Sequence, residues 1–422
     1  MVQKISKRKT GHAGGRFGRW GILLLTCSMV FTLSACGGKK EKKKEVTLSV
    51  WAEETNHELI KKGIKEFQEK YKDEAKIKVK ISTESEETCR DAVLENQEGA
   101  ADLFIFADDQ FGDLYRGNAL LEITDGADEI ISSVGGEDSA AAKTSMRDGK
   151  LYAIPQSAGN GYYMYYNKSY FSDKDVKKLD SMLKVAEKNK KKIAMDLTSG
   201  WYLFSFFKGA GLTLESNEDG TKNICNWNTT KGKYTGKAVV QAILDIVGHN
   251  GFQSYDNDRF VKEVKAGSVI AGVNGPWNAN NMAEIWGDDY GAVKLPTYTL
   301  EGDQVQMCSF SGYKLLGINA HTKEKKWAMR LARALTTKEM QLERFRQIGE
   351  APADTEAANS EEVQASPAMV ALNAQAPYSF VQNITDTYWD PSSILGTALA
   401  GGNADGKDLQ EMLDEAVSQI TK

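Results

Sequence analysis

The stretch VTLSVWAEETNHELIKKGIKEFQEKYKDEAKIKVKI, residues 46–81, combines two hydrophobic periodicities. Apolar and polar residues alternate over 46–50 and again over 77–81, which is typical of β-strands. Between these runs, apolar residues recur at helical spacing and predict an amphipathic helix: Ile60, Ile64, Phe67 and Tyr71. The stretch therefore predicts a strand, a helix and a second strand.

The same alternation continues along the chain. We expect a helix over 86–96, followed by an apolar run at 103–106 that lies between Asp102 and Asp108. A short apolar run of this kind is typical of a strand buried on both faces, as in a parallel sheet. Further expected elements are strands at 151–154, 162–166, 193–197 and 269–273, a helix at 234–247 and a strand that begins at Gly312. The fold class is therefore α/β with open sheets.

Two segments, 155–161 and 308–313, interrupt the pattern of predicted strands and helices along the chain. They predict two lobes, with the first sheet completed by chain that returns from the second lobe. A third connection is expected at 364–376. The predicted lobes are discontinuous, 46–156 with 312–364 and 157–311 with 365–422, and a ligand cleft is expected between them.

The beginning of the chain has the layout of a secretory signal, with basic residues over 4–19 and an apolar run over 20–33. This run is shorter than the roughly 20 residues of a membrane span. Residues 33–36 read LSAC and resemble a bacterial lipobox, so we expect 1–35 to be a lipoprotein signal peptide and Cys36 to carry the lipid anchor. The alternative is a soluble secreted protein. Residues 36–45 are expected to form a flexible tether.

Composition excludes several classes of protein. The net charge is -5, and beyond residue 35 it is -11, so a nucleic-acid binder is not expected. Three cysteines, Cys89, Cys225 and Cys308, allow at most one disulfide, and neither they nor the dispersed histidines predict a metal site. No catalytic motif is present, and paired acids such as Asp108 and Asp109 are typical of solvated loops. We expect no enzyme activity and no cofactor.

Aromatic residues in loops point to a ligand instead. Trp201, Trp277 and the pair Tyr388 and Trp389 lie beside glycine, proline or asparagine. An indole face can cover the apolar face of a pyranose while nearby acids and amides bond to its hydroxyls. The alternative for each tryptophan is a place in the core, which Trp51 and Trp327 fit best.

These residues resemble the extracellular solute-binding proteins of carbohydrate ABC transporters, most closely the maltodextrin-binding type. Residues 274–277 (NGPW), followed by 295–298 (LPTY), are similar to that type's NGPW and LPTF segments in order and separation. Weaker similarity lies at 102–112, 166–168, 317–319 and 419–422, so the resemblance spans 46–422. It implies a two-lobed periplasmic-binding-protein fold that closes on an oligosaccharide and presents it to a membrane permease, and we expect a monomer.

The resemblance also implies binding residues. Trp277, Trp201 and Trp389 match or lie near the family's aromatic platforms, and Asp109 matches an acid of the first lobe. The other candidate contacts are Glu53, Glu54, Phe106, Asn160 and Tyr388.

Several positions depart from the family pattern. Phe106 replaces a tryptophan, Gln110 an arginine and Asn160 a glutamate, and the loop after the first strand has no lysine. The expected ligand is an α-glucan fragment of a few units, with other oligosaccharides open. The alternatives are an exported glycan-degrading enzyme, a binding protein for peptides or polyamines, and a surface adhesin for starch.

Overall fold

The computed structural model describes residues 43–217 and 220–422. The expected signal peptide and Cys36 lie outside these residues. Strand β1 (Lys44–Ala52) begins inside the segment expected to be a tether. Within the described residues, no helix is both long enough and apolar enough to cross a bilayer.

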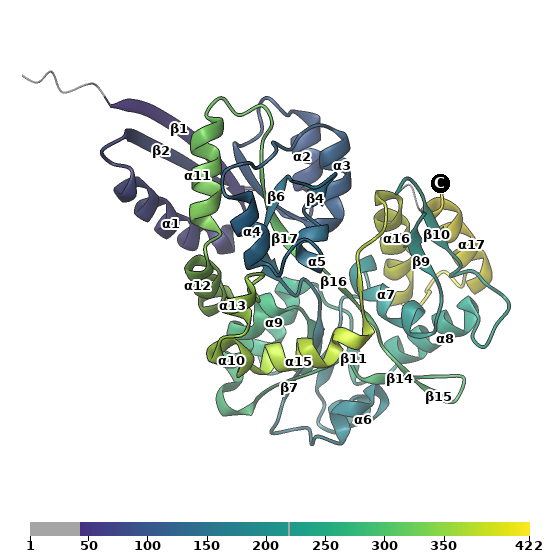
Figure 1. Ribbon diagram of the computed structural model, residues 1–422. Coiled ribbons are helices and arrows are strands. Elements are labelled where there is room, and N and C mark those ends of the chain that lie inside the picture. Colours follow the sequence, from purple (N-terminus) through teal and green to yellow (C-terminus); the bar gives the residue numbers. More distant parts are fainter. Residues whose placement is uncertain (1–42, 218–219) are drawn as a thin grey trace, which may run out of the picture. The chain divides into compact units, whose positions relative to one another are not determined.

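The first sheet contains the predicted strand–helix–strand stretch. Its strand order is β2-β1-β3-β17-β6, with β1 parallel to β2 (Ala75–Thr83) and to β3 (Leu103–Ala107). Helices α1 (His57–Lys70) and α11 (Lys325–Leu335) contact one another beside β1 and β2 (Figure 1). Their apolar stripes and the strands share one hydrophobic core, in which Trp327 is buried as predicted.

The returning chain completes this sheet. Strand β17 (Tyr313–Ile318) lies antiparallel to both β3 and β6 (Ala153–Ala158). The strand predicted at 151–154 is split, because β5 (Lys150–Leu151) pairs with β4 (Met146–Arg147) before β6 begins. Around this sheet lie α2 (Cys89–Glu95), η2 (Asp108–Gln110), α3 (Phe111–Arg116), α4 (Ala127–Ser133) and α5 (Ala140–Lys143).

The second sheet has the order β11-β8-β12-β7-β13. Strand β8 (Lys192–Ala194) is parallel to β11 (Phe252–Gln253) and β12 (Val269–Asn274), whereas β7 (Tyr163–Asn167) is antiparallel to β12 and β13 (Tyr290–Val293). Strand β8 is shorter than predicted because the chain turns at 196–199 into α7 (Gly200–Gly209). Its neighbours are α6 (Leu179–Lys188), α8 (Gly236–Val247), α9 (Asn257–Lys265), α10 (Ala279–Trp286) and the hairpin of β14 (Thr297–Leu300) and β15 (Asp303–Gln306).

Three connections between the sheets lie side by side. The Asn160 backbone N–H donates to the Gly312 carbonyl oxygen at 3.0 Å, and the Ala158 N–H donates to that of Ala351 at 2.7 Å. The two breaks predicted at 155–161 and 308–313 therefore meet in space. Along the third connection, Val363 already packs with Tyr163 of the second sheet. The exact lobe boundaries stay a prediction.

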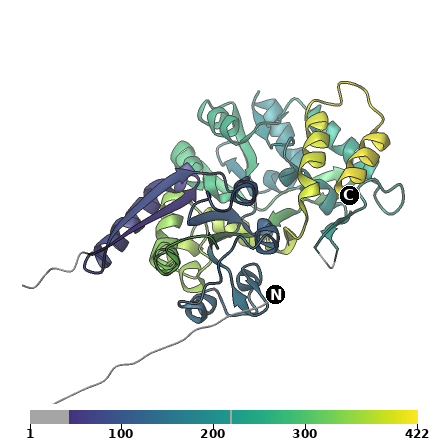
Figure 2. The same cartoon turned by 90° about the horizontal axis from the view of Figure 1, so that it is seen from above.

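The last part of the chain is mainly helical. After α12 (Lys338–Ile348), α13 (Thr355–Ala358), α14 (Glu361–Gln364) and α15 (Pro367–Gln375), strand β18 (Ser379–Val381) pairs with β16 (Ser309–Ser311). Helices α16 (Trp389–Ala400) and α17 (Leu409–Ile420) contact each other and α8, and they appear as the yellow helices of Figure 2. Cys89, Cys225 and Cys308 are all free thiols, so no disulfide joins them.

Candidate binding site

A cleft of about 1570 Å³ lies where loops from both sheets meet. Much of its lining follows the carboxyl ends of the parallel strands β1, β3, β8 and β12, which is where open α/β sheets bind ligands. Further lining comes from β17, the end of α12 and the segment that leads into α16. The topology therefore brings residues more than 300 positions apart to one site.

Six of the nine predicted contact residues line this cleft: Glu53, Asp109, Asn160, Trp201, Trp277 and Trp389. The other three do not. Phe106 is 0% exposed, because its position in β3 directs it into a core with Phe104 and Phe111. Tyr388 is also 0% exposed, and its hydroxyl donates to the Gly200 carbonyl oxygen at 2.7 Å. Glu54 is exposed on the short helix η1 (Glu54–Asn56) and does not belong to the lining.

The NGPW segment forms the end of β12 and the short helix η4 (Pro276–Asn278). The Trp277 indole N–H donates to the Asn257 side-chain oxygen at 3.2 Å. A Cβ atom on Gly275 would lie 2.0 Å from the Trp277 ring, so a glycine there lets the indole fold back over the loop. The Tyr165 hydroxyl also holds this loop, because it donates to the Gly275 carbonyl oxygen at 2.7 Å. These contacts fix the orientation of the Trp277 ring.

Trp201 and Trp389 share one support. The centroid of Phe310 lies 5.2 Å from that of Trp201 and 6.2 Å from that of Trp389. Trp201 lies in the first turn of α7, where the Ser199 side chain accepts from its backbone N–H at 3.3 Å. The Trp201 indole N–H is buried without a hydrogen-bond partner, although such groups are almost always paired.

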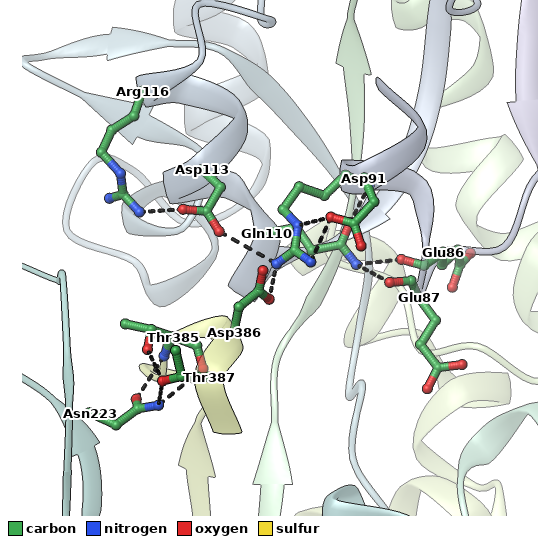
Figure 3. Close-up of polar contacts among 11 residues, drawn as sticks. Glu86, Glu87, Asp91, Gln110, Asp113, Arg116, Asn223, Thr385, Asp386 and Thr387 are labelled. Atoms are coloured by element: carbon green, nitrogen blue, oxygen red, sulfur yellow. Dashed lines mark hydrogen bonds and ion pairs between the residues drawn. The ribbon is translucent and has the colours of Figure 1, made fainter. Parts of the chain in front are cut away.

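Gln110, at a position where the resemblance led to an arginine, braces the first wall of the cleft. Its amide nitrogen donates to the backbone oxygens of Glu86 at 2.6 Å and Glu87 at 3.1 Å (Figure 3). Its side-chain oxygen accepts from the Arg90 backbone N–H at 3.0 Å. In place of a charged arginine, this chain therefore has a neutral glutamine whose hydrogen bonds link two loops.

An ion pair joins the two walls. The guanidinium of Arg90, on α2, pairs with Asp386, in η7 (Asp386–Tyr388), and Asp91 and Asp113 hold the same guanidinium at 2.8 and 3.4 Å (Figure 3). Asp386 follows Thr385, which bonds to Asn223 of β10 (Asn223–Cys225) in the second lobe. Sequence reasoning missed this pair because nothing local relates residues 296 positions apart.

A buried ionic cluster forms another part of the lining. The Lys314 ammonium lies 2.7 Å from a carboxylate oxygen of Glu86 and 2.6 Å from one of Glu350. Arg344 lies 3.8 Å from the second oxygen of Glu350. Burial raises the pKa of Glu86 to about 7, whereas the Lys314 and Arg344 cations outweigh burial and lower the pKa of Glu350. A lysine inside the apolar strand YKLLGI was the available sequence signal, and it was missed.

Burial also raises the pKa of Asp109, to about 6, although the Arg90 cation opposes the shift. One oxygen of this carboxylate has no hydrogen-bond partner. The stabilising contribution of its neutral form is full below about pH 3.8 and is lost as the pH rises through about 6. We therefore compare the free energy of unfolding of Asp109→Asn with that of the wild type. As the pH rises from 4 to 7.5, we expect this difference to shift in favour of the variant by at most roughly 3 kcal/mol. Urea unfolding at both pH values measures this difference, and a pH-independent difference would contradict it.

Comparisons with known proteins agree with this geometry. The model of the bacterial extracellular solute-binding protein family matches residues 62–371. A structure of a protein solved with acarbose is 28% identical, with a TM-score of 0.77 over 89% of this chain and 98% of the other. A maltodextrin-binding protein from L. casei BL23 is 26% identical, with a TM-score of 0.71 over 89% and 99%.

A third comparison concerns the fold alone. The Thermus thermophilus maltotriose-binding protein bound with maltotriose is 18% identical, with a TM-score of 0.74 over 88% of this chain and 98% of the other. The predicted two-lobed α/β fold is confirmed by these matches, and the family match covers most of the chain. Together with the cleft, they show that this chain belongs to the bacterial extracellular solute-binding protein family, whose members bind solutes and are not enzymes.

Proposed function

We propose that this chain is the lipid-anchored substrate-binding component of an ABC importer, which captures malto-oligosaccharides and delivers them to a membrane permease. The observation that carries the proposal is that Trp201, Trp277 and Trp389, from three separate loops, line one cleft together with several acids and amides. This is the combination that an oligosaccharide requires, flat apolar faces for its rings and polar groups for its hydroxyls. The relative solved with acarbose and the maltodextrin-binding relative support the same ligand class.

In the proposed site, the three indoles stack on sugar rings. Glu53, Asp109 and Asn160 bond to hydroxyls at the ring edges, and so does the free indole N–H of Trp201. Tyr388 acts indirectly, through the backbone of Gly200 next to Trp201. Phe106 supports the first sheet from its core and does not touch the ligand.

Closure on the sugar couples binding to delivery. Contacts from both walls exist together only when the walls are close, so the ligand shifts the population toward the closed form. The permease can then distinguish loaded from empty protein. Affinity in the micromolar range corresponds to about -8 kcal/mol, which a few stacked rings and their hydrogen bonds can supply.

Titration of tryptophan fluorescence and calorimetry test the ligand class. We expect micromolar binding of maltotriose and longer maltodextrins, and at least tenfold weaker binding of xylo-, cello- and galacto-oligosaccharides of equal length. Preference for one of those other series would overturn the malto-oligosaccharide assignment. Overnight incubation should return maltotriose intact, since shorter products would indicate a glycan-degrading enzyme. Retention on insoluble starch without affinity for maltotriose would indicate an adhesin.

Membership of an extracellular family places the protein outside the cytoplasm. The proposed anchor at Cys36 is tested by expressing Cys36→Ala in a bacterial host and separating membranes from soluble material. We expect the wild type in the membrane fraction and the variant among the soluble secreted proteins. Equal partition of the two would refute the anchor and leave sugar binding unaffected. The proposed monomer is checked by light scattering.

A further inference from the structure

The cluster of Lys314, Glu86 and Glu350 lies opposite the ring of Trp277. The Lys314 ammonium is 5.8 Å from the centroid of that ring. All four residues line the cleft, although the side chains of Lys314, Glu86 and Glu350 are only 11%, 8% and 4% exposed. The cluster therefore faces the surface on which a sugar would stack.

Two of these groups have unused hydrogen-bonding capacity. An ammonium carries three N–H donors, and the two carboxylates near Lys314 account for two of them. Glu86 uses one carboxylate oxygen on Lys314, while its other oxygen is buried without a partner. A buried carboxylate oxygen without a partner is costly, so a hydroxyl group that bonded to it would be stabilised there. A free donor and a free acceptor thus lie next to each other.

We propose that Lys314 and Glu86 recognise a pair of adjacent hydroxyl groups on the sugar ring that stacks on Trp277. Lys314 donates to one hydroxyl oxygen, and the free oxygen of Glu86 accepts from the neighbouring hydroxyl. Glu350 holds the ammonium in place from behind and is itself held by Arg344. The proposal rests on the proposed function and names the specificity-determining residues of that site.

Charge balance dictates how the pair can be tested. Loss of Lys314 alone would leave two buried carboxylates and could unfold the protein. Glu86→Gln preserves shape and leaves the Lys314–Glu350 pair intact. In the double variant Glu86→Gln/Lys314→Gln, one charge of each sign is removed, so the remaining Glu350 and Arg344 still balance. Lys294→Gln is the matched control, because Lys294 is a partly buried lysine outside the cleft that bonds to Gln306.

The experiment crosses protein variants with ligand variants. Calorimetry compares maltose and a panel of its monodeoxy analogues on wild type, Glu86→Gln, the double variant and Lys294→Gln, after thermal unfolding confirms that each is folded. We expect one or two deoxy positions to cost the wild type and Lys294→Gln about tenfold in affinity. We expect the same positions to cost the double variant less than twofold, because the partner of the missing hydroxyl is gone.

Each outcome is decisive. Deoxy penalties that persist unchanged in Glu86→Gln and in the double variant would overturn the assignment, even if overall affinity fell, because a merely structural role would lower affinity for all analogues alike. Should the double variant fail to fold, the penalties measured in Glu86→Gln decide the question. If the folded wild type binds no maltose or maltotriose, the proposed function itself fails and this inference falls with it.

Discussion

Trp277→Ala is expected to weaken maltotriose binding by roughly 10- to 150-fold. Burial of one aromatic side chain contributes about 1.5 to 3 kcal/mol, and each 1.4 kcal/mol corresponds to a tenfold change in affinity. Trp277 offers its ring to the cleft from a loop that Asn257 and Tyr165 hold in place, so alanine at this position removes an already oriented aromatic face. Calorimetry on the folded wild type and the folded variant measures the change in affinity.

The matched control is Trp286→Ala. Trp286 ends α10, nine residues farther along the chain, and packs against the second-sheet core without lining the cleft. Its removal should lower stability and leave the affinity of the folded protein within about twofold of the wild type. Unchanged affinity in Trp277→Ala would remove this ring from the site, and equal losses in both variants would show that the effect is not local.

Arg344→Met is expected to destabilise the protein by roughly 3 to 5 kcal/mol, which is the typical cost of breaking a buried charge pair. Arg344 is 2% exposed and bonds to Asn56 and Gln156, besides pairing with Glu350. Methionine fills a similar volume but leaves the cluster of Glu86, Lys314 and Glu350 with a net negative charge. Urea unfolding followed by circular dichroism measures the difference.

Arg346→Met is the control on the same helix. Arg346 is half exposed and forms its ion pair with Glu362 at the surface. Exposed pairs contribute little because water screens them, so the unfolding midpoint should change little. Similar losses in both variants would show that burial of the Glu350 pair does not determine the effect.

The fold could be predicted because its signals are local. The alternation over 46–50 and 77–81 and the helical spacing from Ile60 to Tyr71 placed β1, α1 and β2 correctly, since each pattern depends on neighbouring residues alone. The predicted ends of helices and strands were less accurate. Strand β8 stops at Ala194 instead of residue 197, because the turn at 196–199 that starts α7 ends the pairing earlier.

The candidate site was predicted in part. Trp201, Trp277 and Trp389 stood out as aromatic residues beside turn formers, and all three line the cleft. Phe106 and Tyr388 have the same chemistry but are buried, because burial depends on which face of an element meets the core. The charged partners Arg90 with Asp386, and Lys314 with Glu86 and Glu350, gave no pattern that could be recognised in advance.

By itself, the sequence determined the alternation of strands and helices, the aromatic loops and the resemblance to solute-binding proteins. Only the tertiary structure decided which loops converge, which aromatic rings remain open to a ligand, and which charges neutralise one another. The physical reason is the distance along the sequence over which each kind of interaction acts. Hydrophobic periodicity acts between residues a few positions apart, whereas the cleft and its ion pairs depend on sheet topology, which joins segments hundreds of residues apart.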